Sequence, residues 1–221
     1  LALQSTTCSR TTVVPWVRSA RGAMFWADRG ATTVVKRRAP DGTIATFAAG
    51  PFRDVPWMTA TPDGLLYLVD SNRLMRIAAD RSVSTVLAAV SARKHSPGGL
   101  WPGAGGTVYV SVPEERLVLE VRPDGSKRVA ARSPLSWAAY GGMLDRRGNL
   151  WLLETSTKNA VRVRRIDKAG KEKTYGWPRR NPCGEDRRSR RARDPGPAVG
   201  RRRSKVGQAR ALTHIVLDEI P

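Results

Sequence analysis

The chain has 221 residues, with 39 lysines and arginines against 19 aspartates and glutamates, so its formal net charge at pH 7 is +20. No stretch reaches the eighteen or so consecutive apolar residues of a membrane-spanning helix. The two cysteines, Cys8 and Cys183, match no zinc-binding or redox spacing. The composition therefore excludes a helical membrane protein and predicts a soluble, strongly basic one with no membrane insertion.

One short phrase recurs along the chain, as GAMFWAD, GLLYLVD, GTVYVSV and GNLWLLE. The phrases begin 42 residues apart, at Gly22, Gly64, Gly106 and Gly148. An aromatic residue follows three positions later in every copy, at Phe25, Tyr67, Tyr109 and Trp151. Such an internal repeat indicates a fold built from repeated structural units.

Each unit divides into four short extended runs separated by turn signals such as PDG, and four strands with a period near 40 predict a blade of a β-propeller. In chain order the predicted blades cover about 13–48, 55–89, 99–131 and 135–175, and a fifth begins at Trp177. A tryptophan marks the first strand of each blade, at Trp16, Trp57, Trp101 and Trp137. These tryptophans either fill the space between blades or stack on a ligand in the central channel.

The second unit, PWMTATPDGLLYLVDSNRLMRIAADRSVSTVLA, resembles the NHL-type repeat and the related propellers of the gluconolactonase/senescence-marker and streptogramin-lyase groups. The resemblance extends over about 13–177 and implies a propeller of five to seven blades, without implying a particular chemistry. Because only four blades are legible, we expect an all-β fold that is an incomplete or truncated five- to six-bladed propeller with open edges.

The segment 178–221 differs in kind from the blades, because it has no aromatic residue and carries 12 basic against 5 acidic residues. Three interpretations stay open. The segment is a disordered basic tail, a polyanion-binding arm, or an out-of-frame translation of DNA that encoded further blades. Residues 1–177 are basic as well, with 27 basic and 14 acidic residues.

The resemblance also raises a metal-dependent function. Gluconolactonase-like relatives hold a divalent cation such as calcium on the propeller axis, where it polarises a lactone carbonyl. Candidate ligands are the acids that end the second strand of three blades, Asp28, Asp70 and Glu154. Two features disfavour this site: the acids are suited to capping their own turns, and the inner-strand glutamate of the metal-dependent relatives has no counterpart here.

The remaining candidate site is a group of loop residues at one rim of the propeller, Arg53, Asp54, Arg93, Lys94 and His95. Loops on a rigid scaffold are where binding residues concentrate, and like charges around one opening favour an anion. The leading hypothesis is therefore a non-enzymatic scaffold, without a cofactor, that binds an anionic small molecule or an acidic protein surface. The alternatives are a metal-dependent lactonase, hydrolase or lyase, and an RNA-binding propeller. The compartment stays open; LALQSTTC at the start is compatible with a cleaved export signal.

Overall fold

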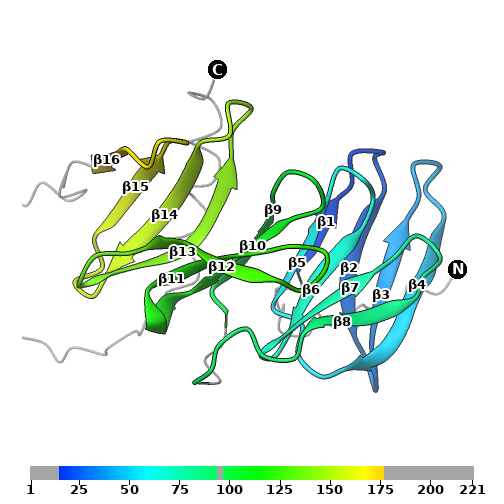
Figure 1. Cartoon of the computed structure of the whole chain (residues 1–221). Coiled ribbons are helices and arrows are strands. Elements are labelled where there is room, and N and C mark those ends of the chain that lie inside the picture. The colour runs from blue at the N-terminus through cyan, green and yellow to red at the C-terminus, as the bar shows by residue number, and fades with distance from the viewer. Residues whose placement is uncertain (1–14, 94–96, 177–221) are drawn as a thin grey trace, which may run out of the picture. The chain divides into compact units, whose positions relative to one another are not determined.

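The computed structural model of the chain describes residues 15–93 and 97–176 (Figure 1). These residues form sixteen strands and one short 3-10 helix, and all of them belong to one compact unit that ends at Gly176. The predicted start of a fifth blade at Trp177, the segment 178–221, and Lys94 and His95 lie outside the described residues.

The strands form four antiparallel sheets of four strands each, and every sheet uses its strands in chain order. The first two sheets contain β1 (Trp16–Arg18), β2 (Met24–Arg29), β3 (Thr33–Arg38) and β4 (Ile44–Phe52), then β5 (Trp57–Ala60), β6 (Leu66–Asp70), β7 (Arg73–Ile77) and β8 (Val83–Leu87). The last two contain β9 (Gly99–Pro102), β10 (Val108–Val112), β11 (Leu117–Val121) and β12 (Lys127–Arg132), then β13 (Trp137–Leu144), β14 (Leu150–Ser156), β15 (Val161–Ile166) and β16 (Glu172–Gly176).

The prediction of four blades of four strands is confirmed. The glycine that opens each repeated phrase has a positive φ, between 74° and 91°, at Gly22, Gly64, Gly106 and Gly148. A side chain is strained in that conformation, so the glycine is required where the chain leaves the turn and enters the second strand.

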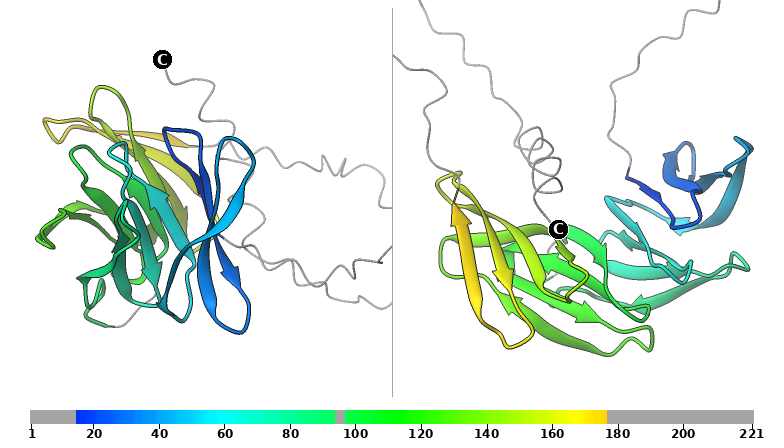
Figure 2. Two further views of the ribbon diagram at one scale, coloured as in Figure 1. Left: turned by 90° about the vertical axis from the view of Figure 1, so that its right-hand side faces the viewer. Right: turned by 90° about the horizontal axis from the view of Figure 1, so that it is seen from above.

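Consecutive blades lie beside each other, and the first strand of each blade contacts the first strand of the next, β1 with β5, β5 with β9 and β9 with β13 (Figures 1 and 2). These inner strands carry the four marker tryptophans, as predicted. Their burial differs: Trp101 is buried, whereas Trp16 is 60% exposed and Trp57 is 38% exposed. The indole of Trp57 donates a hydrogen bond of 2.9 Å to the Pro97 carbonyl in the connection to the third blade.

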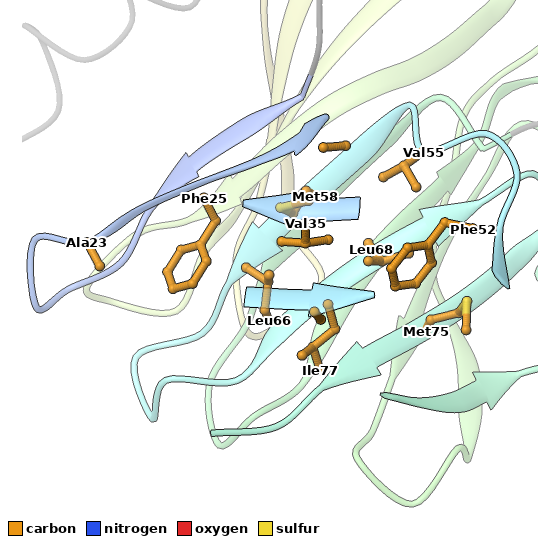
Figure 3. Close-up of a cluster of buried hydrophobic side chains, with 12 residues drawn as sticks. Ala23, Phe25, Val35, Phe52, Val55, Met58, Leu66, Leu68, Met75 and Ile77 are labelled. Atoms are coloured by element: carbon orange, nitrogen blue, oxygen red, sulfur yellow. The ribbon is translucent and has the colours of Figure 1, made fainter. Parts of the chain in front are cut away.

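Each pair of neighbouring blades encloses its own apolar core. Between the first and second blades, Phe25, Ala27 and Val35 pack against residues of the second blade that include Leu66 and Leu68 (Figure 3). We call the face of a blade that carries the repeated aromatic its back face, and the opposite face its front face. The back face of one blade thus packs on the front face of the next.

The same arrangement holds for the other two blade contacts. Tyr67, Val69 and Leu74 form the back face of the second blade and pack with Val108 and Val110 of the third. Tyr109 and Val118 of the third blade pack in turn with apolar residues of the fourth, Ala139, Leu150 and Leu152. The aromatic position is at most 9% exposed in the first three blades, so the prediction that it points into the core is confirmed there.

The turns on the side of the PDG motifs are closed by aspartates that accept hydrogen bonds from nearby backbone N–H groups. Asp145 is the most extensively bonded of them. It accepts hydrogen bonds from the Asn149 backbone and side chain, at 2.8 and 2.7 Å, and from the Trp151 indole, at 3.0 Å. Desolvation raises the pKa of Asp145, but the hydrogen bonds from Trp151 and Asn149 outweigh it and bring the pKa to about 2.

Replacing Tyr67 with alanine should destabilise the protein by about 3–5 kcal/mol, because it removes a fully buried aromatic ring and leaves a cavity. The matched control is Trp151→Ala at the same repeat position, which is only half-buried and should cost less. Equilibrium unfolding in urea measures both. An unchanged midpoint for the Tyr67 variant would mean that its ring is not in the core.

Asp145 should make stability depend on pH in the acid range. Its pKa is lowered in the folded state from the ordinary 3.8 to about 2, so its contribution is present above pH 3.8 and is lost as the pH falls towards 2. We expect Asp145→Ala to lower the free energy of unfolding by about 1–2 kcal/mol at neutral pH. The gap to the parent should close in acid, and a gap that does not change with pH would contradict this assignment.

Candidate functional site

The rim opposite the PDG turns is formed by the connections between blades together with the turns between second and third strands. One residue that organises this rim is Asp70, whose carboxylate is fully buried at the end of β6. One of its oxygens accepts hydrogen bonds from the backbone N–H groups of Arg53 and Asp54, at 2.9 and 2.8 Å. The other forms an ion pair with Arg73 across the turn. Asp70 thereby fixes the connection from the first blade to the second.

The same turn holds the next connection through Asn72. The side chain of Asn72 donates to the Ser91 carbonyl at 2.8 Å and accepts from the Ser91 N–H at 2.9 Å. The Val90 N–H donates to the Asn72 carbonyl at 2.8 Å, and the Ser71 N–H donates to the Asp54 carbonyl at 2.8 Å. We call residues 70–73 the hub turn, because they bind the connections on both sides of the second blade.

Carboxylates of the third and fourth blades bond to the connections ahead of them through serine hydroxyls. The Ser91 hydroxyl donates to the carboxylate of Glu115, and the Ser133 hydroxyl donates to that of Glu154 at 2.7 Å. In the third blade Val112 occupies the repeated acidic position, and the acid comes three residues later, at the end of the 3-10 helix η1 (Pro113–Glu115). Every described connection between blades is therefore bonded to a carboxylate of the blade that follows it.

Glu154 is the most heavily paired of these acids. It is fully buried, and Arg164, which is only 2% exposed, donates to it from Nε and Nη2 at 3.1 and 2.8 Å. Arg162 adds a bond from Nε at 2.7 Å and stacks its guanidinium over the ring of Trp137, 4.0 Å from the centroid. Two arginines thus neutralise this carboxylate inside the contact between the third and fourth blades.

The predicted ligand-binding residues divide into three groups. Arg53 and Arg93 are exposed, and within the described part of the chain neither guanidinium has an ion pair. Asp54 is exposed as well, but its carboxylate pairs with Arg29 at 2.9 Å. Lys94 and His95 lie outside the described residues, so their part in the site stays a prediction.

The structure does not bring together the three predicted metal ligands. Asp70 and Glu154 each bond to arginine and to the preceding connection, whereas Asp28 is exposed and its carboxylate has no hydrogen-bond partner among residues 15–93 and 97–176. No three His, Cys, Asp or Glu side chains gather within these ranges as a metal site would require. The described residues therefore do not fit the divalent cation that the resemblance implies.

Two of these acids have a role beyond the capping of their own turns that the sequence suggests. Asp70 pairs with Arg73 of its own turn, but it also accepts hydrogen bonds from the backbone of the connection ahead of it, and Glu154 accepts one from the Ser133 hydroxyl of the connection ahead of its own blade. Sequence reasoning missed Ser91 and Ser133, and it did not predict the bonds that Asn72 makes to Ser91. A signal was present, since Ser91 and Ser133 are separated by one period of 42 residues.

No protein-family model matches the chain, and no curated protein matches it in sequence. Among solved structures, a catalytically inactive histidine-to-alanine variant of virginiamycin B lyase from Staphylococcus aureus, with quinupristin, matches with a TM-score of 0.61 and 17% identity. The match covers 79% of this chain and 59% of the lyase. The nidogen/laminin complex matches with a TM-score of 0.61 and 15% identity, over 74% of this chain and 64% of that one.

A gluconolactonase from Xanthomonas campestris also matches, with a TM-score of 0.51 and 16% identity, over 62% of this chain and 52% of the enzyme. These three neighbours represent the streptogramin-lyase, NHL and gluconolactonase propeller groups that the sequence resembles. The chain has a β-propeller fold. It spans less than two thirds of the length of the first lyase structure, and the likenesses at this identity establish the fold alone. Within the described residues of the propeller, no helix is both long enough and apolar enough to cross a bilayer.

Replacing Asp70 with alanine should destabilise the propeller by about 2–4 kcal/mol, because it leaves two backbone N–H groups without their acceptor and Arg73 without its carboxylate partner. Asp28→Ala is the matched control, since Asp28 occupies the same repeat position but is exposed, and it should change stability by less than about 0.5 kcal/mol. Thermal unfolding compares the two, and equal losses would show that the hub turn has no special role.

Proposed function

We propose that this propeller is a non-enzymatic scaffold that binds an anionic ligand or an acidic protein surface through Arg53 and Arg93 at the rim. The observation that carries the proposal is the hub turn. Asp70 fixes the backbone of Arg53, and Asn72 fixes Ser91, whose hydroxyl accepts a hydrogen bond of 3.2 Å from the Arg93 N–H. Both backbones are thereby ordered before any ligand arrives, while both guanidinium groups stay in solvent.

This arrangement favours recognition of an anion for two physical reasons. An ordered backbone lowers the entropy lost on binding, since only the side chains remain to be fixed. Arginine also presents a planar set of donors that matches carboxylate and phosphate groups in pairs. Acids of this rim are already bonded elsewhere, because Asp70 pairs with Arg73, Asp54 pairs with Arg29 and Glu115 accepts from the Ser91 hydroxyl.

A second candidate function is hydrolysis or elimination on a small cyclic ester. The observation that favours it is that the fold neighbours include two enzymes, a virginiamycin B lyase and a gluconolactonase. The test is conversion of a lactone by the purified chain together with its metal content by mass spectrometry.

RNA binding, suggested by the excess of basic residues in 1–177, is tested by salt-dependent retention on single-stranded RNA.

The leading proposal predicts that the affinity for an anionic probe depends strongly on two rim arginines. With a polyglutamate peptide as the probe, Arg53→Ala combined with Arg93→Ala should weaken binding at least about tenfold, since each lost charge-assisted pair is worth roughly 1 kcal/mol or more. Unfolding in urea should be unchanged. Isothermal titration at moderate salt measures the affinity.

The matched control combines Arg146→Ala with Arg147→Ala, which removes the same charge from an exposed turn on the opposite rim. This variant should bind polyglutamate like the parent. Equal losses from the two double variants would mean non-specific attraction by the basic surface, and the rim proposal would have to be abandoned.

A further inference from the structure

The connection between the third and fourth blades, residues 133–136, carries an exposed leucine on the same rim as Arg53 and Arg93. Leu135 is 77% exposed, more than any other large apolar side chain of the described residues. A single exposed leucine is common on protein surfaces. The position of Leu135 in the repeat and the conformation of its backbone distinguish it from such a residue.

Leu135 and Arg93 occupy equivalent places in successive connections, one period of 42 residues apart. Each lies two residues after a buried serine, Ser91 or Ser133, whose hydroxyl donates to a carboxylate of the blade that follows. The repeat position that presents a cation in the second connection therefore presents an aliphatic side chain in the third.

The backbone on both sides of Leu135 is fixed by hydrogen bonds. The Trp137 N–H donates to the Pro134 carbonyl at 3.1 Å, which closes a tight turn with Leu135 and Ser136 at its centre. The Ser136 carbonyl in turn accepts a hydrogen bond of 2.9 Å from the Thr157 N–H of the fourth blade. The turn is therefore ordered by bonds within the chain.

This turn also contains a strained residue. Ser136 has a φ of 70°, in the left-handed region that favours glycine. Among the described residues other than glycine, it is the only one with a positive φ in a connection between blades. Strained backbone of this kind persists only where the surrounding structure holds it, and it gathers at sites that hold a ligand. The turn thus keeps Leu135 at its tip, in solvent.

The charges near Leu135 are mainly positive. Arg132 is exposed and directly precedes the connection, and Arg116 is half-buried in the turn whose carbonyl accepts the Ser133 N–H at 2.8 Å. Within the described part of the chain neither guanidinium has an ion pair. The exposed acid of that turn is Glu114, so the local balance still favours an acidic partner.

A ligand that reaches Arg53, Arg93 and Leu135 has to span three successive connections. Packed sheets lie about 10 Å apart, so the first and third connections are separated by on the order of 20 Å. A small anion cannot cover that distance, whereas about six residues of an extended polypeptide can.

We propose that the rim binds an acidic polypeptide, whose carboxylates pair with Arg53 and Arg93 while its apolar side chains cover Leu135. This inference rests on the function proposed above and narrows its ligand from anions in general to one kind of polypeptide. Charge attracts many acidic surfaces alike, whereas contact with a fixed apolar side chain selects among them.

Two peptides of equal length and charge provide the test, one of Glu-Glu-Leu repeats and one of Glu-Glu-Gln repeats, each eighteen residues long. By isothermal titration the parent should bind the leucine peptide about five to ten times more tightly, as partial burial of leucine side chains would give. Leu135→Ala should remove this preference and leave the affinity for the glutamine peptide unchanged. Its unfolding in urea should match that of the parent, because the side chain is exposed.

The matched control is Val129→Ala, which shortens another exposed aliphatic side chain. Val129 is 41% exposed and lies on β12, the outer strand of the third blade, away from the connections. This variant should bind both peptides like the parent.

Benzoylphenylalanine in place of Leu135 identifies what covers the position. On irradiation in the presence of the leucine peptide it should crosslink to that peptide, and mass spectrometry locates the bond. Crosslinks only within the chain or between two copies would make the protein itself the occupant and overturn the proposal. Preferential crosslinking to a single-stranded RNA oligonucleotide in competition with the peptide would make the rim a nucleic-acid site.

The titrations separate failure of this proposal from failure of the function on which it rests. If the parent binds neither peptide, the anion-binding rim is wrong and this inference falls with it. If the parent binds both peptides equally, or if Leu135→Ala keeps the preference for leucine, the rim binds anions but Leu135 does not select the partner. An equal loss of both affinities in Leu135→Ala would also overturn the proposal, because the side chain would then act through the fold.

Discussion

The packing of one blade on the next depends on hydrogen bonds from the loop that connects the two blades to a carboxylate of the second one. Apolar packing alone does not determine how one four-stranded blade packs on another, because aliphatic faces of similar size fit one another in many ways. In this chain Asp70, Glu115 and Glu154 each bond to the connection that leads into their own blade. These directional bonds place the front face of each blade against the back face of the blade before it.

The same bonds connect the fold to the proposed function. Because the hub turn fixes the backbone on both sides of the second blade, Arg53 and Arg93 project from ordered positions although they lie in loops. The burial of Asp70 and Glu154 has a further consequence, since a buried carboxylate must be paired. Arg73 pairs with Asp70 and Arg164 pairs with Glu154. Both carboxylates also bond to the connection ahead of their own blade.

Most of the fold could be predicted from the sequence, because a repeat of 42 residues with a glycine and an aromatic in fixed positions leaves few alternatives. Gly64 and Tyr67 were predicted correctly, each from local physics: a positive φ and a buried strand position. The partners of Asp70 in the connection ahead of its blade could not be predicted in the same way. They lie 16 and 17 residues away and are backbone N–H groups, which leave no trace in residue type.

Hydrogen exchange of the backbone amides of Arg53, Asp54 and Ser91 tests the central claim most directly. If carboxylate and amide side chains hold the connections, these three amides should exchange only through the opening that also exposes β6, with a free energy close to that of global unfolding. If they exchange at the rate of a solvent-exposed loop while the β6 amides remain protected, the connections are not fixed, and the rim arginines have no ordered support.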